Sequence, residues 1–464
     1  MIYAPLSLGV TAFLLCSIAT PLCRNLCLRL KIVDHPDGTR KLHCKPIPRV
    51  GGVPIVLSYA GAVALMAAVA PRAALIHIQH QALLWSMLPA VALVFATGLL
   101  DDLVGLRPSH KLVGQVVAAV FAVTFGARIH LLTGVPSSAW ITLPLSVLWL
   151  LGCTNAFNLI DGLDGLASGV GLFATVTVLF AAMLQGNMGL AMATIPLAAC
   201  LLAFLRYNFS PASIFLGDCG SMTIGFLLGC FGLIWSQKSA TLLGMSAPVM
   251  AMAVPLIDVG LSIGRRFLSS RPIFEADRGH IHHRLLAKGL KPRNVALILY
   301  GVCGIAAMLS LLQSVVAYQF RGLTVVLFCA LALYGVKRLG YVEFQLARRM
   351  LSRKSILRSL QEELYLHDLK LLLESAQTVE ACWAVVSTAC QDMQFDSVQM
   401  QLKGREFEAN GTMCAATYSW QLTVSLGTTG YLRLARLRES DSPRLMMSVV
   451  HSLQETIRAK DLAA

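Results

Sequence analysis

Charged residues are scarce in this sequence, and their scarcity excludes an ordinary water-soluble fold. Only 13% of the 464 residues are charged, 56% are hydrophobic, and the mean hydropathy is +0.68. Soluble domains carry roughly 25% charged residues. Apolar stretches of about 20 residues, the length that crosses a bilayer, recur through the first 340 residues. The composition therefore predicts an integral membrane protein.

Two further absences narrow the class of protein. The 13 cysteines form no Cys-x-x-Cys pair and follow no regular spacing, so neither a disulfide framework nor a zinc site is predicted. The N-terminus lacks the basic segment of a cleavable signal peptide. Its first apolar stretch is instead followed by Arg24, Arg29 and Lys31, which indicates a retained helix with its C-terminal end in the cytoplasm.

Apolar periodicity predicts an all-α polytopic membrane protein with about 11 transmembrane helices and the N-terminus outside. The expected spans are 5–23, 50–70, 82–100, 112–128, 139–157, 166–184, 189–206, 220–237, 242–264, 294–318 and 322–339. In this topology the cytoplasmic loops carry 18 Lys and Arg, against four in the opposite loops. That asymmetry follows the positive-inside rule. The basic charge therefore indicates membrane topology, anionic lipids and phosphorylated ligands, and not nucleic acid.

The chain beyond residue 340 has a balanced composition, with 14 basic and 14 acidic residues from Tyr341 onward. We expect three parts: a transmembrane domain over 1–340, a connecting amphipathic helix over 341–377 and a small cytoplasmic α+β domain over 378–464. Within the last part, helices are predicted at 379–393 and 443–459, and strands near 397–402, 417–426 and 431–437. This α+β domain faintly resembles GAF-type sensory domains.

Acidic residues of the first 340 gather on one side of the predicted membrane. Nine of the ten lie in cytoplasmic loops or at their edges. The ten acidic residues are Asp34, Asp37, Asp101, Asp102, Asp161, Asp164, Asp218, Asp258, Glu275 and Asp277. Clustered carboxylates repel one another unless a cation neutralises them. A hard metal ion is therefore predicted.

The Asp101–Asp102 pair ends the third span. Adjacent helical side chains point about 100° apart, so one carboxylate can face a metal or substrate while the other meets Lys111 or a neighbouring helix. A solvated helix cap is the plain alternative.

Four polar residues recur at a spacing of three where the fifth span leaves the membrane: Asn155, Asn158, Asp161 and Asp164. That spacing can align amide and carboxylate groups on one helix face. The two Asp-Gly pairs allow close approach of a ligand, although Asp-Gly is also ordinary turn chemistry.

Asp218 lies in a Gly-Asp-Cys-Gly turn at the expected start of the eighth span. The positive end of a helix helps to hold an anion and its metal ion. Phe215, three residues earlier, can stack on a nucleobase, although a phenylalanine at a membrane boundary is often simply interfacial. Asp258, an acid inside a span, is expected to pair with a basic group.

Two basic loops complete the set. The last loop contains His280, His282 and His283 among Arg278, Arg284 and Lys288. A His-x-His-His run suits a transition metal or a plain surface, but the basic neighbours favour phosphate. The first loop adds Lys41, His43, Lys45 and Arg49.

Together the DD pair, NAFNLIDGLDGL, FLGDCGS and HIHHR resemble the polyprenyl-phosphate N-acetylhexosamine-1-phosphate transferase family (glycosyltransferase family 4 type), over about residues 1–340. The resemblance implies attack by undecaprenyl phosphate on the β-phosphate of a UDP-sugar, with release of UMP. It also implies a multi-pass protein of a bacterial cytoplasmic (inner) membrane with its active site on the cytoplasmic face. Such enzymes start cell-wall or O-antigen polysaccharide synthesis.

The resemblance also implies roles for individual residues. Asp218, with Asp161, would be the Mg²⁺ ligand, and Asp101, beside Asp102, would bind or deprotonate the lipid phosphate. Asn158, Asp161 and Asp164 would line the nucleotide end. The expected substrate-binding residues are Lys41, His43, Arg49, Lys111, Asn155, Asn158, Asn208, Phe215, His280, His282, His283 and Arg284.

Several alternatives stay open at this point. The histidine loop and the segment PDGTRKLH resemble the UDP-GlcNAc branch, but UDP-MurNAc-pentapeptide or another UDP-N-acetyl-amino sugar is also a possible donor. A lipid or solute transporter is the rival from another class, although transporters usually place charges near the bilayer midplane. The expected partners are the nucleotide sugar, the lipid phosphate and membrane lipids. A homodimer is also possible, and the tail can regulate, dimerise or dock a partner.

Overall fold

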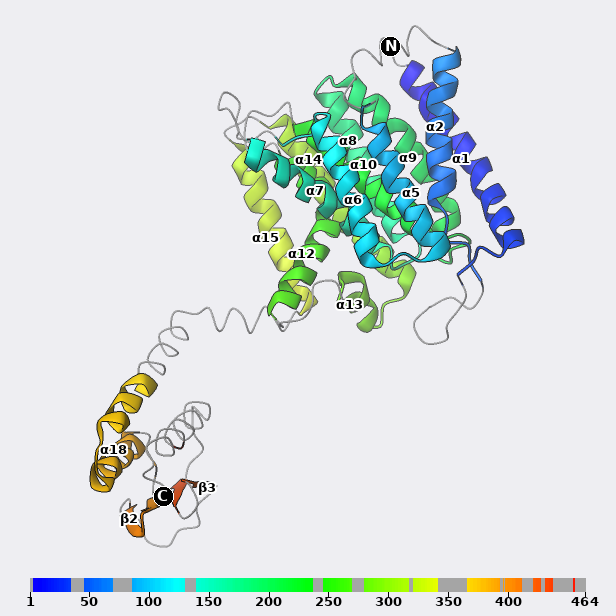
Figure 1. Ribbon diagram of the computed structural model, residues 1–464. Coiled ribbons are helices and arrows are strands. Elements are labelled where there is room, and N and C mark those ends of the chain that lie inside the picture. Colours follow the sequence, from blue (N-terminus) through cyan, green and yellow to red (C-terminus); the bar gives the residue numbers. More distant parts are fainter. Residues whose placement is uncertain are drawn as a thin grey trace. The chain divides into compact units, whose positions relative to one another are not determined.

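The computed structural model divides into two compact units, Met1–Glu343 and Phe344–Ala464 (Figure 1). The structure describes residues 3–34, 46–69, 86–129, 139–236, 245–268, 279–316, 320–340, 365–392, 395, 397–410, 420–426, 430–436 and 454. Each unit has its own buried apolar cluster, and each is considered by itself.

Helices make up the first unit. They are α1 Tyr3–Leu30, α2 Gly52–Val69, α5 Leu88–Val104, α6 Pro108–Thr124, α7 Ala139–Ile160, α8 Leu166–Leu184, α9 Met188–Asn208, α10 Gly217–Ser236, α11 Ser246–Ala251, α12 Ala253–Leu268, α13 Ile281–Ala287, α14 Pro292–Val315 and α15 Arg321–Leu339. Eight of them in the described ranges are long and apolar enough to cross a membrane, which confirms a polytopic membrane protein. The helices α5, α6 and α12, with 17, 17 and 16 residues, are shorter, so the count of eleven stays a prediction.

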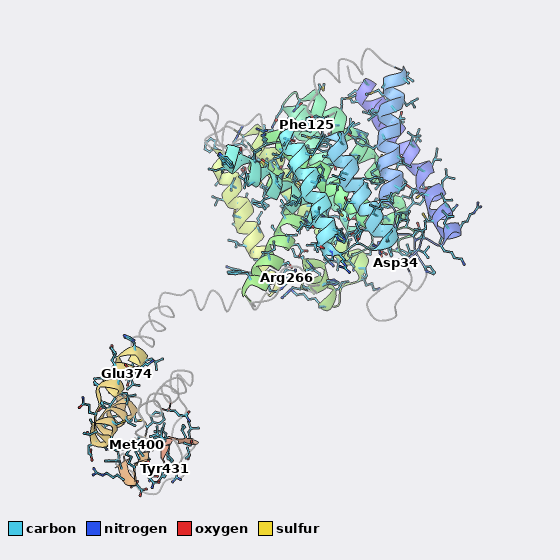
Figure 2. The ribbon with its side chains drawn as sticks, viewed as in Figure 1. Asp34, Phe125, Arg266, Glu374, Met400 and Tyr431 are labelled. Carbon is cyan, nitrogen blue, oxygen red and sulfur yellow. The ribbon has the colours of Figure 1, made fainter. Side chains whose placement is uncertain are left out.

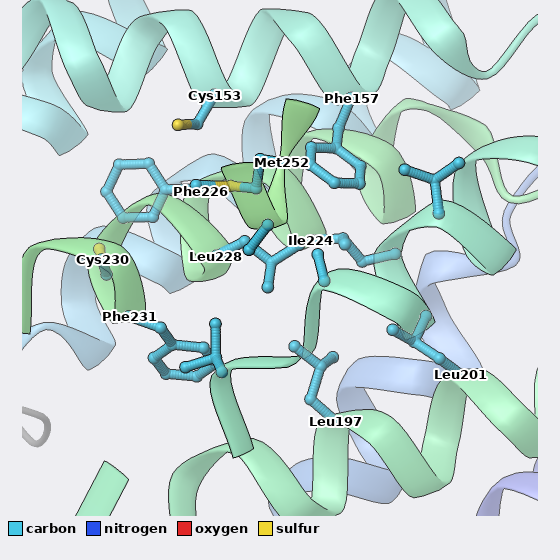
Figure 3. Close-up of a cluster of buried hydrophobic side chains, with 14 of the residues drawn as sticks. Cys153, Phe157, Leu197, Leu201, Ile224, Phe226, Leu228, Cys230, Phe231 and Met252 are labelled. Atoms are coloured by element: carbon cyan, nitrogen blue, oxygen red, sulfur yellow. The ribbon is translucent and has the colours of Figure 1, made fainter. Parts of the chain in front are cut away.

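Helix α10 lies at the centre of this unit and packs against α5, α7 and α8. Its side chains Ile224, Phe226 and Phe231 are almost completely buried, together with residues of α7 and α9 (Figure 3). Close packing depends on small residues: a Cβ added at Gly225 would lie 2.6 Å from the Cys153 carbonyl oxygen of α7. The position of α10 is therefore tightly set by its neighbours.

Polar and apolar side chains separate along the helices. Asp34 and Arg266 lie at one end of the helical unit, and Phe125 lies at the opposite end (Figure 2). Large apolar side chains such as Leu22, Leu148 and Leu323 are exposed on the outer helices, as expected for contact with lipid.

The second unit contains an antiparallel sheet of order β2-β1-β4-β3. Its strands are β1 Ser397–Leu402, β2 Arg405–Asn410, β3 Trp420–Ser425 and β4 Tyr431–Arg436, and helix α18 (Val379–Asp392) contributes to the core. The predicted α18, β1, β3 and β4 are confirmed. Strand β2 is absent from the prediction, although the Lys403–Gly404 turn, with φ +49° and +73°, is typical of a tight hairpin. The segment 341–364 and, apart from Gln454, the predicted helix 443–459 lie outside the described residues.

Candidate active site

A short backbone ladder holds the segment before α2 against the segment before α10. The amides of Gly51 and Gly52 donate to the carbonyls of Phe215 and Leu216, both at 2.9 Å, and the Phe215 amide donates to Pro48 at 2.8 Å. Asp218 then lies in the first turn of α10, as predicted. The ladder therefore holds Pro48–Gly52, the end of the basic first loop, beside the start of α10.

The end of α5 supplies the carboxylate pair. Helix α5 continues to Val104, four residues beyond the predicted span end at 100, and ends at Gly105, with φ +74°, so both aspartates belong to its last turn. Asp101 accepts the Leu106 amide at 2.8 Å and the Lys111 ammonium at 3.1 Å. The same ammonium pairs with Asp218. Lys111 thus contacts both Asp101, which the resemblance assigns to the lipid phosphate, and Asp218, which it assigns to the metal ion.

Asp102 turns away from Lys111 and is fully buried. Its carboxylate pairs with Arg49, at 3.2 Å from Nη2, and accepts the backbone amides of Asp218 and Cys219, each at 2.9 Å. The two members of the pair therefore have different surroundings, as the 100° offset predicted.

The amides of α7 point to two neighbouring helices. Asn155 donates to the side chain of Gln115 on α6 at 2.8 Å, and Asn158 donates to Ser221 on α10 at 3.2 Å. Both lie within α7, which reaches Ile160 and so extends past the predicted end of the span. These contacts fix the end of α7 beside the start of α10.

Asp161 and Asp164 follow in the turn after α7. Asp164 accepts the Ala212 amide at 3.0 Å, which ties this turn to the segment before α10. Burial raises the pKa of Asp161 well above its usual value, and repulsion from Asp218 and Asp102 raises it further. Carboxylates from α5, α10 and this turn are therefore close enough to repel one another.

The histidine segment is anchored by Asp258 of α12. The Asp258 carboxylate accepts the Ile281 amide at 2.7 Å and lies 2.9 Å from His280 Nδ1. The prediction that Asp258 pairs with a basic group is therefore confirmed. The contact fixes the orientation of the His280 ring.

His282 connects this segment to the turn after α7. Its ring is 1% exposed, and neither nitrogen has a hydrogen-bond partner among the described residues. A Cβ added at Gly162 would lie 2.6 Å from His282 Nε2, so only glycine allows this approach. The structure thus brings His282 next to the Asp161–Asp164 turn.

We expect the pH dependence of stability to report on His282. Burial, with His283 adding to it, lowers the pKa of His282 from 6.5 to about 4. Because protonation then favours the unfolded chain, stability falls as the pH drops from 6.5 towards 4, by about 3 kcal/mol in total. Thermal unfolding in detergent should show a shallower decline for His282→Gln than for the wild type. Parallel curves for the two proteins would contradict this assignment.

Comparison with known proteins now decides the family. Residues 84–236 match the model of Glycosyl transferase family 4. A relative from Bacillus subtilis (strain 168), a probable undecaprenyl-phosphate N-acetylglucosaminyl 1-phosphate transferase, is 33% identical over 63% of this chain and 80% of its own. The chain belongs to glycosyl transferase family 4.

Two further relatives are similar to this chain. A decaprenyl-phosphate N-acetylglucosaminephosphotransferase of Mycobacterium tuberculosis (strain H37Rv) is 34% identical over 64% of this chain and 80% of its own. A phospho-N-acetylmuramoyl-pentapeptide-transferase of Latilactobacillus sakei is 29% identical over 44% of this chain and 67% of its own. The family match includes the carboxylates from Asp101 to Asp218.

Not every predicted site residue of this family 4 chain faces the carboxylates. Asn208 is buried and has a structural role. Its side chain accepts a hydrogen bond from the Ser168 hydroxyl at 2.6 Å and donates one to the Ile214 carbonyl at 2.9 Å. Arg284 donates to the Gly340 carbonyl at the end of α15. Lys41 and His43 lie outside the described residues.

The donor set of the site fits Mg²⁺. In the described ranges no group of three or more potential metal-ligating side chains encloses an ion. Mg²⁺ usually binds through one or two carboxylates together with substrate phosphates and water, and so does not need such a group. The hard oxygens of Asp218, Asp101 and Asp161 meet that requirement.

Proposed function

We propose that this family 4 protein transfers N-acetylglucosamine-1-phosphate from UDP-GlcNAc to undecaprenyl phosphate and releases UMP. The observation that carries the proposal is the meeting of Asp101, Lys111 and Asp218 at one end of the helical unit, beside Arg49. Relatives named for the same transfer support it. The reaction would be a first membrane step in the synthesis of a cell-envelope polysaccharide.

Charge neutralisation is the main task in this chemistry. The lipid phosphate and the nucleotide diphosphate are both anionic, and positioning plus electrostatic stabilisation supply most of the catalysis of phosphoryl transfer. In our assignment Asp101 binds or deprotonates the lipid phosphate, and the Lys111 ammonium offsets the repulsion between anions. His280 and His282 bind phosphate, and Asn158, Asp161 and Asp164 line the nucleotide end.

A divalent cation completes the proposed site. Asp218, with Asp161, would hold Mg²⁺, or Mn²⁺ in its place, and the ion would neutralise charge on the diphosphate when bound. Its location at the start of α10 is favourable, because the partial positive charge of the helix end supports anionic ligands.

The membrane arrangement is part of the proposal. We infer eleven spans, formed by the eight long helices together with α5, α6 and α11–α12, with the N-terminus outside. The 18 basic residues of the cytoplasmic loops against four opposite support this orientation in a bacterial inner membrane. The polyprenyl chain would lie along the helices in lipid, while its phosphate reaches the cytoplasmic face.

A direct assay tests the proposed function. Purified protein with undecaprenyl phosphate, UDP-GlcNAc and Mg²⁺ should release UMP, and EDTA should abolish the release. UDP-MurNAc-pentapeptide and other UDP-N-acetyl-amino sugars serve as competing donors, because the Latilactobacillus relative is named for the former chemistry. Absence of UMP with every UDP-N-acetylhexosamine would overturn the proposal. A lipid or solute transporter would then be the alternative.

We propose an accessory role for the chain beyond residue 340, with a GAF-like cytoplasmic domain that regulates the enzyme or forms a homodimer. The separate apolar cluster around Met400 and Leu432 supports a domain with its own core. Truncation after residue 342 should leave measurable UMP release. Complete loss of transfer in a truncated protein that still unfolds cooperatively would contradict an accessory role.

A further inference from the structure

The start of α10 has no cap of its own. The first turn of a helix leaves backbone amides without partners, and a Ser, Thr, Asp or Asn residue just before it usually accepts one or two of them. Leu216 precedes α10 and Gly217 is its first residue, so neither provides a side-chain oxygen. Yet Asp218, the proposed metal ligand, lies in this turn and depends on its geometry.

Asp102, which lies on α5, caps the start of α10. Its Oδ1 accepts the Asp218 amide and its Oδ2 accepts the Cys219 amide, each at 2.9 Å. These are the second and third residues of α10, the two that a local cap would serve. A carboxylate at this position also interacts favourably with the positive end of the helix.

Gly217 makes the approach of Asp102 possible. Its φ is +73°, a conformation that side chains rarely adopt. A Cβ at Gly217 would lie 2.7 Å from Asp102 Oδ2 and still nearer to the Arg49 carbonyl oxygen. The glycine in the Gly-Asp-Cys-Gly turn therefore leaves room for a carboxylate that comes from α5.

Arg49 completes the surroundings of Asp102. Its Nε and Nη2 lie 3.3 and 3.2 Å from Asp102 Oδ1. With two backbone amides and two guanidinium nitrogens, four donors face a carboxylate that has about four acceptor positions. The Asp102 side chain has no exposed surface, whereas 11% of the Asp101 side chain is exposed and its carboxylate pairs with Lys111. The adjacent Asp101 thus keeps capacity for a ligand that Asp102 lacks.

We propose that Asp102 is a positioning residue that caps α10 and sets the orientation of Asp218, with Arg49 as its counter-charge. It then acts on the reaction through Asp218 and does not itself bind the metal ion or take a proton from the lipid phosphate. The effect on turnover rests on the proposed function, in which Asp218 holds Mg²⁺, but the cap itself does not depend on it.

Hydrogen–deuterium exchange of the metal-free full-length protein in detergent tests the cap. In Asp102→Ala, exchange of the Asp218 and Cys219 amides should speed up by about 10-fold or more, because the cap is lost. Asp102→Asn keeps one acceptor oxygen and should show a smaller increase. Arg49→Gln keeps the Asp102 carboxylate and should show the smallest increase in exchange rate. Unchanged exchange in Asp102→Ala would overturn the proposal, whether or not the protein releases UMP.

Kinetics separate positioning from direct catalysis. A misplaced metal ligand costs up to about 10²-fold in rate, so kcat should fall in graded order from the wild type through Asp102→Asn to Asp102→Ala. The midpoint of the acidic limb in the kcat–pH profile should be the same in Asp102→Asn as in the wild type. Asp101→Asn is the matched variant and should be far less active. If Asp102→Asn were as inactive as Asp101→Asn and lost the acidic limb, Asp102 would be a catalytic base. If Asp102→Ala does not fold, Asp102→Asn and Arg49→Gln still test the positioning role of Asp102.

Discussion

Replacement of Asp218 by asparagine is expected to lower kcat for UMP release by about 10³-fold, since loss of a metal-ion ligand removes several kcal/mol of charge stabilisation. The substitution Asp218→Asn preserves the volume of the side chain, and the backbone amide at this position can still donate to Asp102. The fold should therefore persist, and the loss should appear in catalysis and in Mg²⁺ affinity. UMP release at varied Mg²⁺, together with thermal unfolding in detergent, measures both.

A matched carboxylate elsewhere provides the control for Asp218→Asn. Asp368 is exposed on the helix over 365–375 in the second unit, so Asp368→Asn changes the same charge away from the site. Its kcat and Mg²⁺ dependence should equal those of the wild type. Near-normal turnover of Asp218→Asn would remove Asp218 as the metal ligand and leave Asp161 as the main candidate.

The sequence predicts the individual helices well because each carries its own signal. Helix α10 is expected over 220–237 and spans Gly217–Ser236, so that Asp218, predicted in the turn at the helix start, lies in its first turn. The ends of α5 and α7 lie a few residues beyond the predicted span ends, 100 and 157, because hydropathy falls at polar residues even where the backbone stays helical. Asp101 and Asn158 are such residues.

The pairings inside the site are only partly predictable. Spacing along one helix shows which side chains share a face, but it does not show which distant helix they meet. Asp102 contacts Cys219, 117 positions away, and Asp258 contacts His280, 22 positions away. An intramembrane acid signals that some partner exists. Leu216 shows only that the residue before α10 cannot cap it, and does not show which group accepts the first amides.

Replacement of Lys111 by methionine is the second change with a large expected effect. The ammonium lies between Asp101 and Asp218, so its loss leaves two carboxylates facing each other without a fixed cation. It also removes a positive charge that offsets the repulsion between two phosphates. We expect kcat to fall by about 10²-fold in Lys111→Met. Lys111→Arg retains the charge and should keep a larger share of activity.

Stability measurements distinguish the loss of this charge from a general disturbance of α6. In EDTA, Lys111→Met should unfold at a lower temperature than the wild type, because the repulsion between Asp101 and Asp218 is no longer neutralised. Saturating Mg²⁺ should raise its unfolding temperature more than that of the wild type, since a divalent cation supplies the missing charge. Equal Mg²⁺-induced shifts in the two proteins would contradict the assignment. They would mean that the ammonium and the metal ion act at separate places, and that Asp101 does not share a cation with Asp218.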